Sequence, residues 1–289
     1  MIVTAPASTA NIGPGFDVLG IALDTNFSIA LNEQPKGGAW EPANDTHPAI
    51  VAYKHAGGVT ELHRVWTQTQ FPYGRGMGFS GAARVAGAYA ALVQNGEDQN
   101  DAKDHAFRIA GDLEGHDDNA APSTYGGFCV TTGGHVMRFD CDPQEQGLKL
   151  LMFIPETTTS TDKSRTSIPE NFSKADLVKS IGNVALLTAM LASNTFNDEV
   201  LKLVTDDVIH QPVRLEASDA SLKAFQAFNE NGAVTQWLSG SGPSVAALVA
   251  EENAEDLVNH MEKLELDCAF SVKEIKISQD GVREVLLNT

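Results

Sequence analysis

Cysteine and positive charge are scarce in this chain of 289 residues. Its three cysteines, Cys129, Cys141 and Cys268, stand far apart and form no CxxC pair. The sequence therefore predicts neither a disulfide framework nor a zinc cluster. There are 20 Lys and Arg residues against 38 Asp and Glu residues, which gives a formal net charge of −18. A surface this acidic repels a phosphate backbone and anionic lipid, so general nucleic-acid binding and membrane docking are excluded.

Long apolar runs and a positively charged start are also missing. The longest apolar stretch, Val184 to Ala192, is too short to cross a bilayer. The first basic residue is Lys36, whereas a secretory signal carries its positive charge before the apolar run. We therefore expect a soluble, reduced, cytoplasmic protein. The 42% of hydrophobic residues and the chain length are typical of a globular protein with one large or two small domains.

The hydrophobic pattern divides the chain at a polar, turn-rich segment, residues 140–147, which predicts domains at 1–147 and 148–289. In the first domain the pattern predicts strands at 2–4, 18–23, 27–31, 65–71, 128–132 and 136–139 and helices at 80–95 and 102–113.

The second domain is expected to have strands at 148–154, 234–238, 245–249 and 269–277 and helices at 173–193, 198–205, 221–230 and 254–264. Ser173 and Asp176 predict a capping box at the start of the long helix. Apart from the additional helices, the order is β-α-β-β-α-β, which is the ferredoxin-like plan.

A glycine-rich segment, Pro72 to Ala83, runs into the first predicted helix and is a candidate phosphate-binding loop. Free backbone N–H groups at the positive end of a helix dipole bind phosphate, and Ser80 is placed to cap the helix or ligate Mg²⁺. The alternative is an ordinary tight turn. A dinucleotide-binding G-x-G-x-x-G is disfavoured because no continuous apolar strand precedes it. A Walker A loop is excluded because the segment has no lysine.

Acidic and polar side chains cluster in a second segment, Glu114 to Asn119, at the end of a predicted helix. The functional interpretation is a site that binds Mg²⁺ and activates a hydroxyl group; the alternative is a solvated loop. Zinc is disfavoured because His116 and Asp118 have no third ligand nearby. His116 is expected to be a hydrogen-bonded structural residue.

Two further segments combine small and polar residues. Ser239 to Ser244 reads Ser-Gly-Ser-Gly-Pro-Ser between two apolar strands, and forms either a ligand-contacting turn or a simple hairpin. Ala5 to Asp17 is expected to be a loop that carries Asn11 and Asp17, either as turn residues or as a site for an amine and a hydroxyl. Because the chain has no G-x-S-x-G here or at Ser80, a hydrolase nucleophile elbow is not predicted.

These four segments, in this order, resemble the motifs of the GHMP kinases, and most closely those of homoserine kinases. The opening segment continues to Gly20, and the acidic segment is followed by Ala121-Pro122 and Gly126-Gly127 as in that family. Additional matches are Thr161 to Arg165 with Pro169, and Gln211 to Arg214, so the resemblance covers nearly the whole chain.

The resemblance implies an α/β (α+β) architecture with an N-terminal ATP-binding domain and a C-terminal ferredoxin-like domain. It implies a transferase that phosphorylates the side-chain hydroxyl of L-homoserine, in threonine biosynthesis, with ATP and Mg²⁺. By position, the nucleotide would lie against Pro72, Gly74, Arg75, Gly76, Gly78, Ser80, Gly81 and Ala82. Mg²⁺ would be held by Ser80 and Glu114.

The resemblance assigns substrate binding to Asn11, Asp17, Asn119, Arg165, Arg214 and Gly240. An aspartate suits an α-ammonium group and two arginines suit an α-carboxylate. The catalytic residues would be Asn119, Asp118 and Glu114, where Asn119 orients the hydroxyl nucleophile. Asp118 aligns with a carboxylate that acts as a base in some members, and its role here is either base or orienting group. A homodimer is expected by analogy with the family.

Three positions depart from the family pattern. Phe79 stands where the phosphate loop has its first serine, Gly81 replaces an alanine, and Asp117 replaces the proline of H-P-D-N. One alternative is a GHMP kinase for shikimate, pantoate or mevalonate. The other is a non-catalytic relative that binds a small molecule as a regulator. Mevalonate and pantoate lack an ammonium group, so Asp17 would have no charge partner in such an enzyme.

Overall fold

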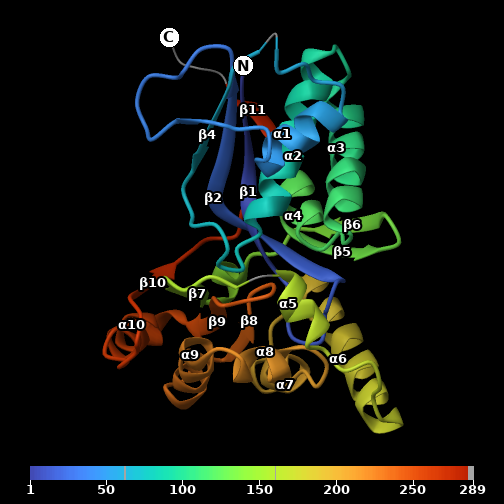
Figure 1. Cartoon of the computed structure of the whole chain (residues 1–289). Helices are drawn as coiled ribbons and strands as arrows, with labels where there is room; N and C mark the ends of the chain where they lie inside the picture. The colour runs from blue at the N-terminus through green and yellow to red at the C-terminus, as the bar shows by residue number, and fades with distance from the viewer. Residues whose placement is uncertain (62, 160, 286–289) are drawn as a thin grey trace.

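The computed structural model describes residues 1–61, 63–159 and 161–285, and leaves out the side chains of residues 161–163. In the described chain the strands form two antiparallel sheets (Figure 1). The first sheet has the order β11-β1-β2-β4-β3, and β5 pairs with β2 and with β6. These strands are β1 (Ile2–Ala10), β2 (Leu19–Leu31), β3 (Glu41–Pro42), β4 (Val65–Thr69), β5 (Phe128–Thr132), β6 (His135–Phe139) and β11 (Arg283–Val285).

One face of the first sheet is covered by α1 (Pro48–His55), α2 (Phe79–Gln94), α3 (Gln99–Glu114) and α4 (Ala120–Tyr125) (Figure 1). The central helix, α2, is rich in Ala and Gly and has most of its length buried. These small side chains let helices approach closely: a Cβ atom on Gly87 would lie 2.0 Å from the backbone oxygen of Ala49 in α1. The start of α2 is thereby fixed over β1 and β2.

The second sheet has the order β10-β7-β9-β8 and lies below the first in Figure 1. Its strands are β7 (Leu148–Pro155), β8 (Thr235–Leu238), β9 (Val245–Ala250) and β10 (Phe270–Glu274). Between β7 and β8 the chain forms α5 (Thr161–Thr166), α6 (Lys174–Ser193), α7 (Asp198–Val204), α8 (Gln211–Glu216) and α9 (Asp219–Glu230), and α10 (Ala254–Met261) follows β9. This strand order and connectivity confirm the predicted ferredoxin-like plan.

The C-terminal segment returns from the second sheet to the first. Ile277 bridges to Leu23 in β2, Val282 is fully buried, and β11 pairs with β1 next to the N-terminus. The predicted boundary at residue 147 stays a prediction, but β11, which that scheme assigns to the second domain, belongs to the first sheet.

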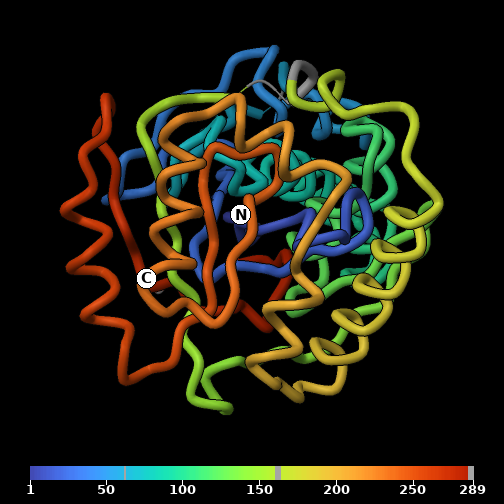
Figure 2. Tube along the Cα trace, turned by 90° about the horizontal axis from the view of Figure 1, so that it is seen from below, coloured from blue at the N-terminus to red at the C-terminus, as the bar shows by residue number. Residues whose placement is uncertain are grey.

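The long helix α6 lies at the edge of the molecule. Figure 2 shows it on the opposite side from α10. The predicted capping box of Ser173 and Asp176 is confirmed at its start. By length and composition alone α6 could span a membrane, and 22% of an apolar stretch of 18 residues within it is buried. A single helix of this kind is weak evidence for a membrane span. The helix is longer than the apolar run of Val184 to Ala192 that the sequence analysis considered.

The structure corrects several predicted elements. The strand expected at 2–4 continues to Ala10, and the two strands expected at 18–23 and 27–31 are one strand, β2. Residues 5–10 were expected to be a loop because their side chains are small or polar. They form a strand because every residue of β1 is buried and paired with β2, with a register shift between Pro6 and Ala7. The short helices α1, α4, α5 and α8 were not predicted.

Candidate active site

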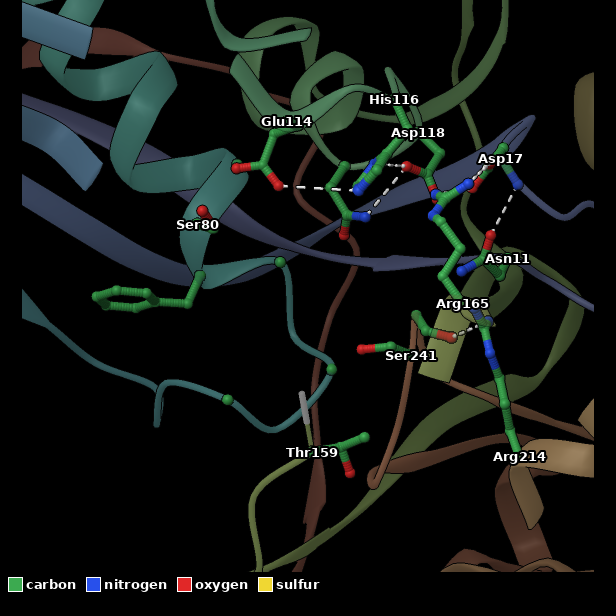
Figure 3. A pocket seen from close by; sticks show the side chains of 17 residues that line it. Asn11, Asp17, Ser80, Glu114, His116, Asp118, Thr159, Arg165, Arg214 and Ser241 are labelled. Atoms are coloured by element: carbon green, nitrogen blue, oxygen red, sulfur yellow. Dashed lines mark hydrogen bonds and ion pairs between the residues drawn. The ribbon is translucent and has the colours of Figure 1, made fainter. Parts of the chain in front are cut away.

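Residues from both parts of the chain line one pocket between the two sheets (Figure 3). They come from the β1–β2 turn, the start of α2, the α3–α4 connection, α5, α8 and the loop between β8 and β9. The lining consists of Asn11, Asp17, Gly74, Gly76, Gly78, Phe79, Ser80, Gly81, Glu114, His116, Asp118, Asn119, Thr159, Arg165, Arg214, Gly240 and Ser241. Thirteen of the sixteen residues that the sequence analysis assigns to the site are in this lining.

Three residues assigned to nucleotide binding lie outside the lining. Pro72 is exposed, and Ala82 is fully buried in the core with its N–H already bonded to the oxygen of Gly78. Arg75 is half-buried, and its backbone oxygen accepts a hydrogen bond from the N–H of Ser244. Any contribution of Ala82 to phosphate binding therefore cannot use its backbone N–H as a free donor.

The phosphate loop depends on glycine at two positions. Gly78 precedes α2 with a φ of 66°, and a Cβ atom there would lie 1.9 Å from Ser8 Oγ in β1. A Cβ atom on Gly76 would lie 2.2 Å from the backbone oxygen of Ser239. The first turn of α2 leaves N–H groups without intrahelical acceptors, at the positive end of the helix dipole. Glycine thus lets the loop pack closely against its neighbours, and the first residues of α2 line the pocket.

Ser80 does not cap α2, contrary to the expectation from the sequence. The N-cap residue is Gly78, which has no side chain, and Ser80 lies in the first turn, where its Oγ accepts a hydrogen bond from Arg84. The residue before it, Phe79, packs against the rings of Phe27, His47, Phe71 and Tyr73, with centroid distances of 5.6 to 6.2 Å. The phenyl ring therefore anchors the loop in an aromatic cluster.

The loop between β8 and β9 holds the phosphate loop from the side of the second sheet. Ser239 Oγ donates to the backbone oxygen of Gly76 over 2.6 Å, and the N–H of Gly240 bonds to the oxygen of Ala10 over 2.9 Å. On the other side, the N–H of Thr159 bonds to the oxygen of Gly74 over 3.2 Å. The Ser-Gly-Ser-Gly-Pro-Ser segment therefore connects the two sheets through these hydrogen bonds and is not a simple hairpin.

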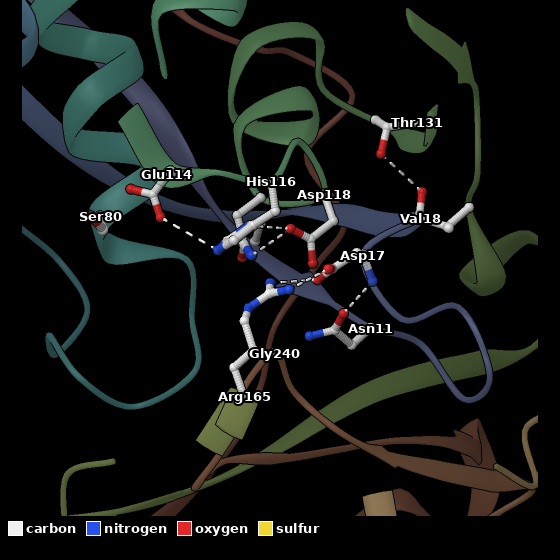
Figure 4. A network of polar contacts seen from close by, with 12 residues as sticks. Asn11, Asp17, Val18, Ser80, Glu114, His116, Asp118, Thr131, Arg165 and Gly240 are labelled. Atoms are coloured by element: carbon white, nitrogen blue, oxygen red, sulfur yellow. Dashed lines mark hydrogen bonds and ion pairs between the residues drawn. The ribbon is translucent and has the colours of Figure 1, made fainter. Parts of the chain in front are cut away.

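The acidic segment begins at the last residue of α3, Glu114, and leads into α4. His116 Nδ1 donates to Asp118 Oδ1 over 2.7 Å, and His116 Nε2 lies 3.9 Å from Glu114 Oε2 (Figure 4). Burial lowers the pKa of His116, but the hydrogen bond and negative charge of Asp118 together outweigh burial and raise it above its ordinary value. His116 is hydrogen-bonded, and the nearby carboxylates of Asp118 and Glu114 favour its protonated form; its structural role stays a prediction.

Asp118 and Asn119 connect this acidic segment to the phosphate loop. Asp118 is 1% exposed, and its Oδ2 atom is buried without a hydrogen-bond partner among the described residues. Asn119 Nδ2 donates to Asp118 Oδ1 over 3.2 Å, while Asn119 Oδ1 accepts from Ser8 Oγ over 2.9 Å. A Cβ atom on Gly81 would lie 3.1 Å from the Cβ of Asn119. The glycine that replaces the family alanine thus lets α2 approach Asn119 closely.

Opposite charges from the two parts of the chain meet at Asp17. Arg165, in α5, forms a two-pronged ion pair with Asp17, with Nη–Oδ distances of 2.6 and 2.8 Å (Figure 4). Asp17 is held in a left-handed turn, with a φ of 58°, and its N–H donates to Asn11 Oδ1 over 2.8 Å. The resemblance assigns these two charged groups to opposite ends of the substrate. In this structure they are bound to each other.

Arg214, in α8, places a second guanidinium group beside the first. The guanidinium carbons of Arg165 and Arg214 lie 5.2 and 5.1 Å from the centre of the Phe16 ring, which is the geometry of cation–π contacts. Arg214 Nη1 donates to the oxygen of Gly240 and to His210 Nδ1, each over 3.2 Å.

Burial, followed by repulsion from Arg165, lowers the pKa of Arg214 to about 10. The guanidinium group is therefore still charged at neutral pH. Arg214 Nε is buried and has no acceptor among the described residues. This donor is the feature that an added carboxylate would satisfy.

Arg84, in α2, contacts both side chains that the resemblance assigns to Mg²⁺. Its Nη1 atom donates to Ser80 Oγ over 2.7 Å and forms an ion pair with Glu114 Oε1. Mg²⁺ binds oxygen at about 2.0–2.1 Å, so a metal bound by both oxygens would need the space of this nitrogen. Ser80 and Glu114 therefore do not fit a metal while Arg84 lies between them. Within the described chain, no group of three or more His, Cys, Asp or Glu side chains is arranged to hold a metal ion.

Sequence reasoning missed the part that Arg84 plays, although a signal was present. Arg84 is the one charged residue in the sequence of α2, and it stands four positions after Ser80. Residues at this spacing are neighbours on a helix surface. Phe16 and Ser8 lie within the segment Ala5 to Asp17 that the sequence marked, but their individual contacts were missed. Those contacts, like the bond from Thr159 to Gly74, come from distant segments. Of the segment from Thr161 to Arg165, the first three side chains lie outside the described residues.

Comparison with known proteins places this arrangement in a family. The GHMP kinases C terminal family matches residues 176–265. Homoserine kinase from Deinococcus radiodurans is 32% identical over 274 residues, which cover 89% of this chain and 87% of that protein. This chain belongs to the homoserine kinase family. Homoserine kinase from Thermus thermophilus is likewise 32% identical over 252 residues, which cover 84% of this chain and 85% of the relative.

Solved structures agree with this assignment. The crystal structure of homoserine kinase from Cytophaga hutchinsonii matches with a TM-score of 0.79 and 25% identity, covering 98% of this chain and 96% of that one. Mevalonate kinase from Methanococcus jannaschii matches with a TM-score of 0.68 and 15% identity over 96% of this chain and 98% of that chain, which shows the shared fold. The expected GHMP kinase architecture is confirmed. Members of this family are phosphotransferases that act on a hydroxyl group and use ATP.

Proposed function

We propose that this chain transfers the γ-phosphoryl group of ATP to the side-chain hydroxyl of L-homoserine, as a step of threonine biosynthesis. One observation carries the choice of substrate: a carboxylate, Asp17, and two guanidinium groups, Arg165 and Arg214, share a pocket with a helix N-terminus suited to phosphate. A small amino acid has the complementary pair of charges. A hydroxy acid without an ammonium group has no positive charge that could take the place of Arg165 beside Asp17.

Substrate binding in this scheme exchanges one set of ion pairs for another. The α-ammonium group of homoserine takes the place of Arg165 beside Asp17, and the α-carboxylate accepts from Arg165 and from the unpartnered Nε of Arg214. Each charge that leaves a protein partner therefore gains a substrate partner. The half-exposed charges of Asp17 and Arg165 and the buried charge of Arg214 are therefore all paired once the substrate is bound.

The hydroxyl group is oriented by the pair of Asp118 and Asn119. Asn119 adjoins Gly78 and Gly81 of the phosphate loop, so a hydroxyl bonded to its side chain lies beside the transferred phosphoryl group. The unpartnered Oδ2 of Asp118 accepts the proton of this hydroxyl, as a base or as an orienting acceptor. Phosphoryl transfer passes through a loose transition state, so alignment and charge neutralisation supply most of the acceleration.

The phosphates of ATP lie against the first turn of α2 and the glycines of the loop, whose N–H groups take up negative charge. Mg²⁺ accompanies ATP and supplies further neutralisation when bound. Ser80 and Glu114 are the ligands that the resemblance assigns to Mg²⁺, and both are held by Arg84 in this structure.

A soluble, cytoplasmic protein that binds neither nucleic acid nor an anionic membrane is the setting that the net charge of −18 favours. A homodimer stays part of this proposal by analogy with the family, and light scattering tests it.

The test is a phosphorylation assay with ATP and Mg²⁺ against homoserine, shikimate, pantoate and mevalonate, with products identified by mass. We expect phosphohomoserine as the product. The variant Asp17→Asn should lose activity on homoserine, whereas an enzyme for mevalonate or pantoate would retain its activity. Binding of homoserine without turnover would support a regulator instead, and a different phosphorylated product would reassign the substrate.

A further inference from the structure

The contacts of Arg84 with Ser80 and Glu114 have a consequence for metal binding. A single atom, Arg84 Nη1, lies within contact of both oxygens, one from the first turn of α2 and one from the last residue of α3. Both of those residues line the pocket beside the glycine loop. A cation already occupies the space where a hydroxyl and a carboxylate converge, and it is covalently part of the chain.

The surroundings of Arg84 stabilise its contact with Glu114. The side chains of Arg84 and Glu114 are 20% and 10% exposed, so their ion pair is largely shielded from water. Shielded charge pairs are screened little by salt, and separating this one leaves Glu114 with only the more distant His116 as a cationic neighbour. Arg84 Nε is itself buried without an acceptor among the described residues, so the guanidinium group is held mainly through Nη1.

We propose that Arg84 and a divalent metal ion exclude each other at the oxygens of Ser80 and Glu114, so that Arg84 is a cation built into the phosphoryl-transfer site. The two cations need the same ligands, and Mg²⁺ demands short, near-ideal oxygen contacts that leave no room for Nη1. A metal that arrives with the nucleotide either displaces Arg84 or is bound without these two oxygens. In both cases Arg84 weakens the binding of metal by the protein. This inference rests on the proposed function only for the presence of the nucleotide.

The deciding measurement is the affinity for Mn²⁺, with free Mn²⁺ followed by electron paramagnetic resonance, with and without saturating ADP. In the variant Arg84→Met the side chain keeps its approximate length but loses its charge and donors. We expect Mn²⁺ to bind about tenfold more tightly or better, because a charge-assisted contact of about 1.5–3 kcal/mol no longer competes. The double variant Arg84→Met/Glu114→Gln should lose this gain, since it removes the freed ligand.

Two controls separate the loss of the Arg84 contact from the change in net charge of the chain and from misfolding. Arg108, exposed on α3, provides a matched change in Arg108→Met, which should leave Mn²⁺ affinity unchanged even though the chain becomes equally more acidic. The variant Arg84→Lys retains a cation and should bind Mn²⁺ nearly as weakly as the original chain. If Arg84→Met does not fold, Arg84→Gln provides the same removal of charge, and thermal melting monitored by circular dichroism identifies which variants are folded.

Unchanged or weaker Mn²⁺ binding in a folded Arg84→Met or Arg84→Gln variant would overturn the inference, and so would an equal gain in Arg108→Met. Homoserine phosphorylation by the original chain is measured in parallel. If the original chain phosphorylates homoserine and Mn²⁺ affinity does not respond to Arg84, only the inference about Arg84 fails. If Mn²⁺ affinity responds and homoserine is not phosphorylated, only the proposed function fails.

Discussion

At the scale of single residues, a change at Arg214 should affect the binding of homoserine but not that of ATP. Its guanidinium group lies against Phe16 and Gly240, on the substrate side of the pocket. We expect Arg214→Met to raise the KM for homoserine about 10- to 100-fold, because a charge-assisted contact with the carboxylate is worth about 1.5–3 kcal/mol. The KM for ATP should change little. Steady-state kinetics in both substrates provide the measurement.

The matched control for this substitution is Arg108→Met, because Arg108 is an exposed arginine away from the pocket. It should leave both KM values unchanged. An equal loss of affinity for ATP and homoserine in Arg214→Met would contradict the assignment of Arg214 to the substrate. A drop in melting temperature in that variant would instead report the loss of its packing against Phe16.

Most candidate residues could be found from sequence because their chemistry follows from local spacing. Asp118 and Asn119 lie together in one short segment, and the glycines of the phosphate loop directly precede a helix. The pairing of Asp17 with Arg165 could not be predicted, since 148 positions separate them. Their contact depends on how the β1–β2 turn meets α5 in three dimensions, which no local pattern records.

At the scale of elements, the start of α2 depends on the contact between Gly78 and β1. In Gly78→Ala the new Cβ atom would meet Ser8 Oγ at 1.9 Å, in addition to the strain of a φ of 66°. We expect a loss of about 2–4 kcal/mol in the free energy of unfolding, about 1 kcal/mol of it from the left-handed backbone and the remainder from overpacking. Affinity for ATP should fall as well, because the loop must shift. Urea denaturation and nucleotide titration measure the two effects.

The turn between β5 and β6 offers the control for this change. Gly133 also has a positive φ, 56°, but a Cβ atom there has no neighbour within 4 Å. Gly133→Ala should therefore cost about 1 kcal/mol from the backbone alone and leave nucleotide affinity unchanged. Similar losses in both variants would show that the contact with Ser8 does not determine the position of the loop.

Elements with strong periodicity were predicted well, and short or unusual ones were not. The helix that became α3 and the strands of the second sheet follow the expected patterns. The strand at 5–10 was missed because Ala, Ser and Thr do not mark a strand by themselves. It is stabilised by tertiary contacts: Thr9 Oγ1 accepts from Trp237 Nε1 over 2.9 Å, and Ser8 Oγ donates to Asn119.

At the scale of the whole molecule, the C-terminal segment ties the last strand of the second sheet to the first sheet. Val282 is fully buried, its N–H bonds to the oxygen of Thr124, and β11 extends β1. Deletion of residues 280–289 removes these contacts, and we expect the melting temperature to fall by about 10 °C. The control is a deletion of residues 286–289, which leaves β11 in place, so the difference between the two truncated chains isolates the contribution of residues 280–285. Equal melting temperatures for the two truncated chains would contradict this role.

The ion pair of Asp17 and Arg165 joins one negative and one positive charge of the pocket before any substrate arrives. When homoserine binds, its ammonium group pairs with Asp17 and its carboxylate pairs with Arg165. Two ion pairs then stand in place of one, and the net charge of the pocket does not change. Homoserine has no net charge and so meets no long-range repulsion from the overall charge of −18, and its affinity should vary little with ionic strength. ATP brings several negative charges to the same acidic chain, so its association should become faster as salt is added. Dissolved salt would thus affect the binding of ATP but leave the binding of homoserine nearly unchanged.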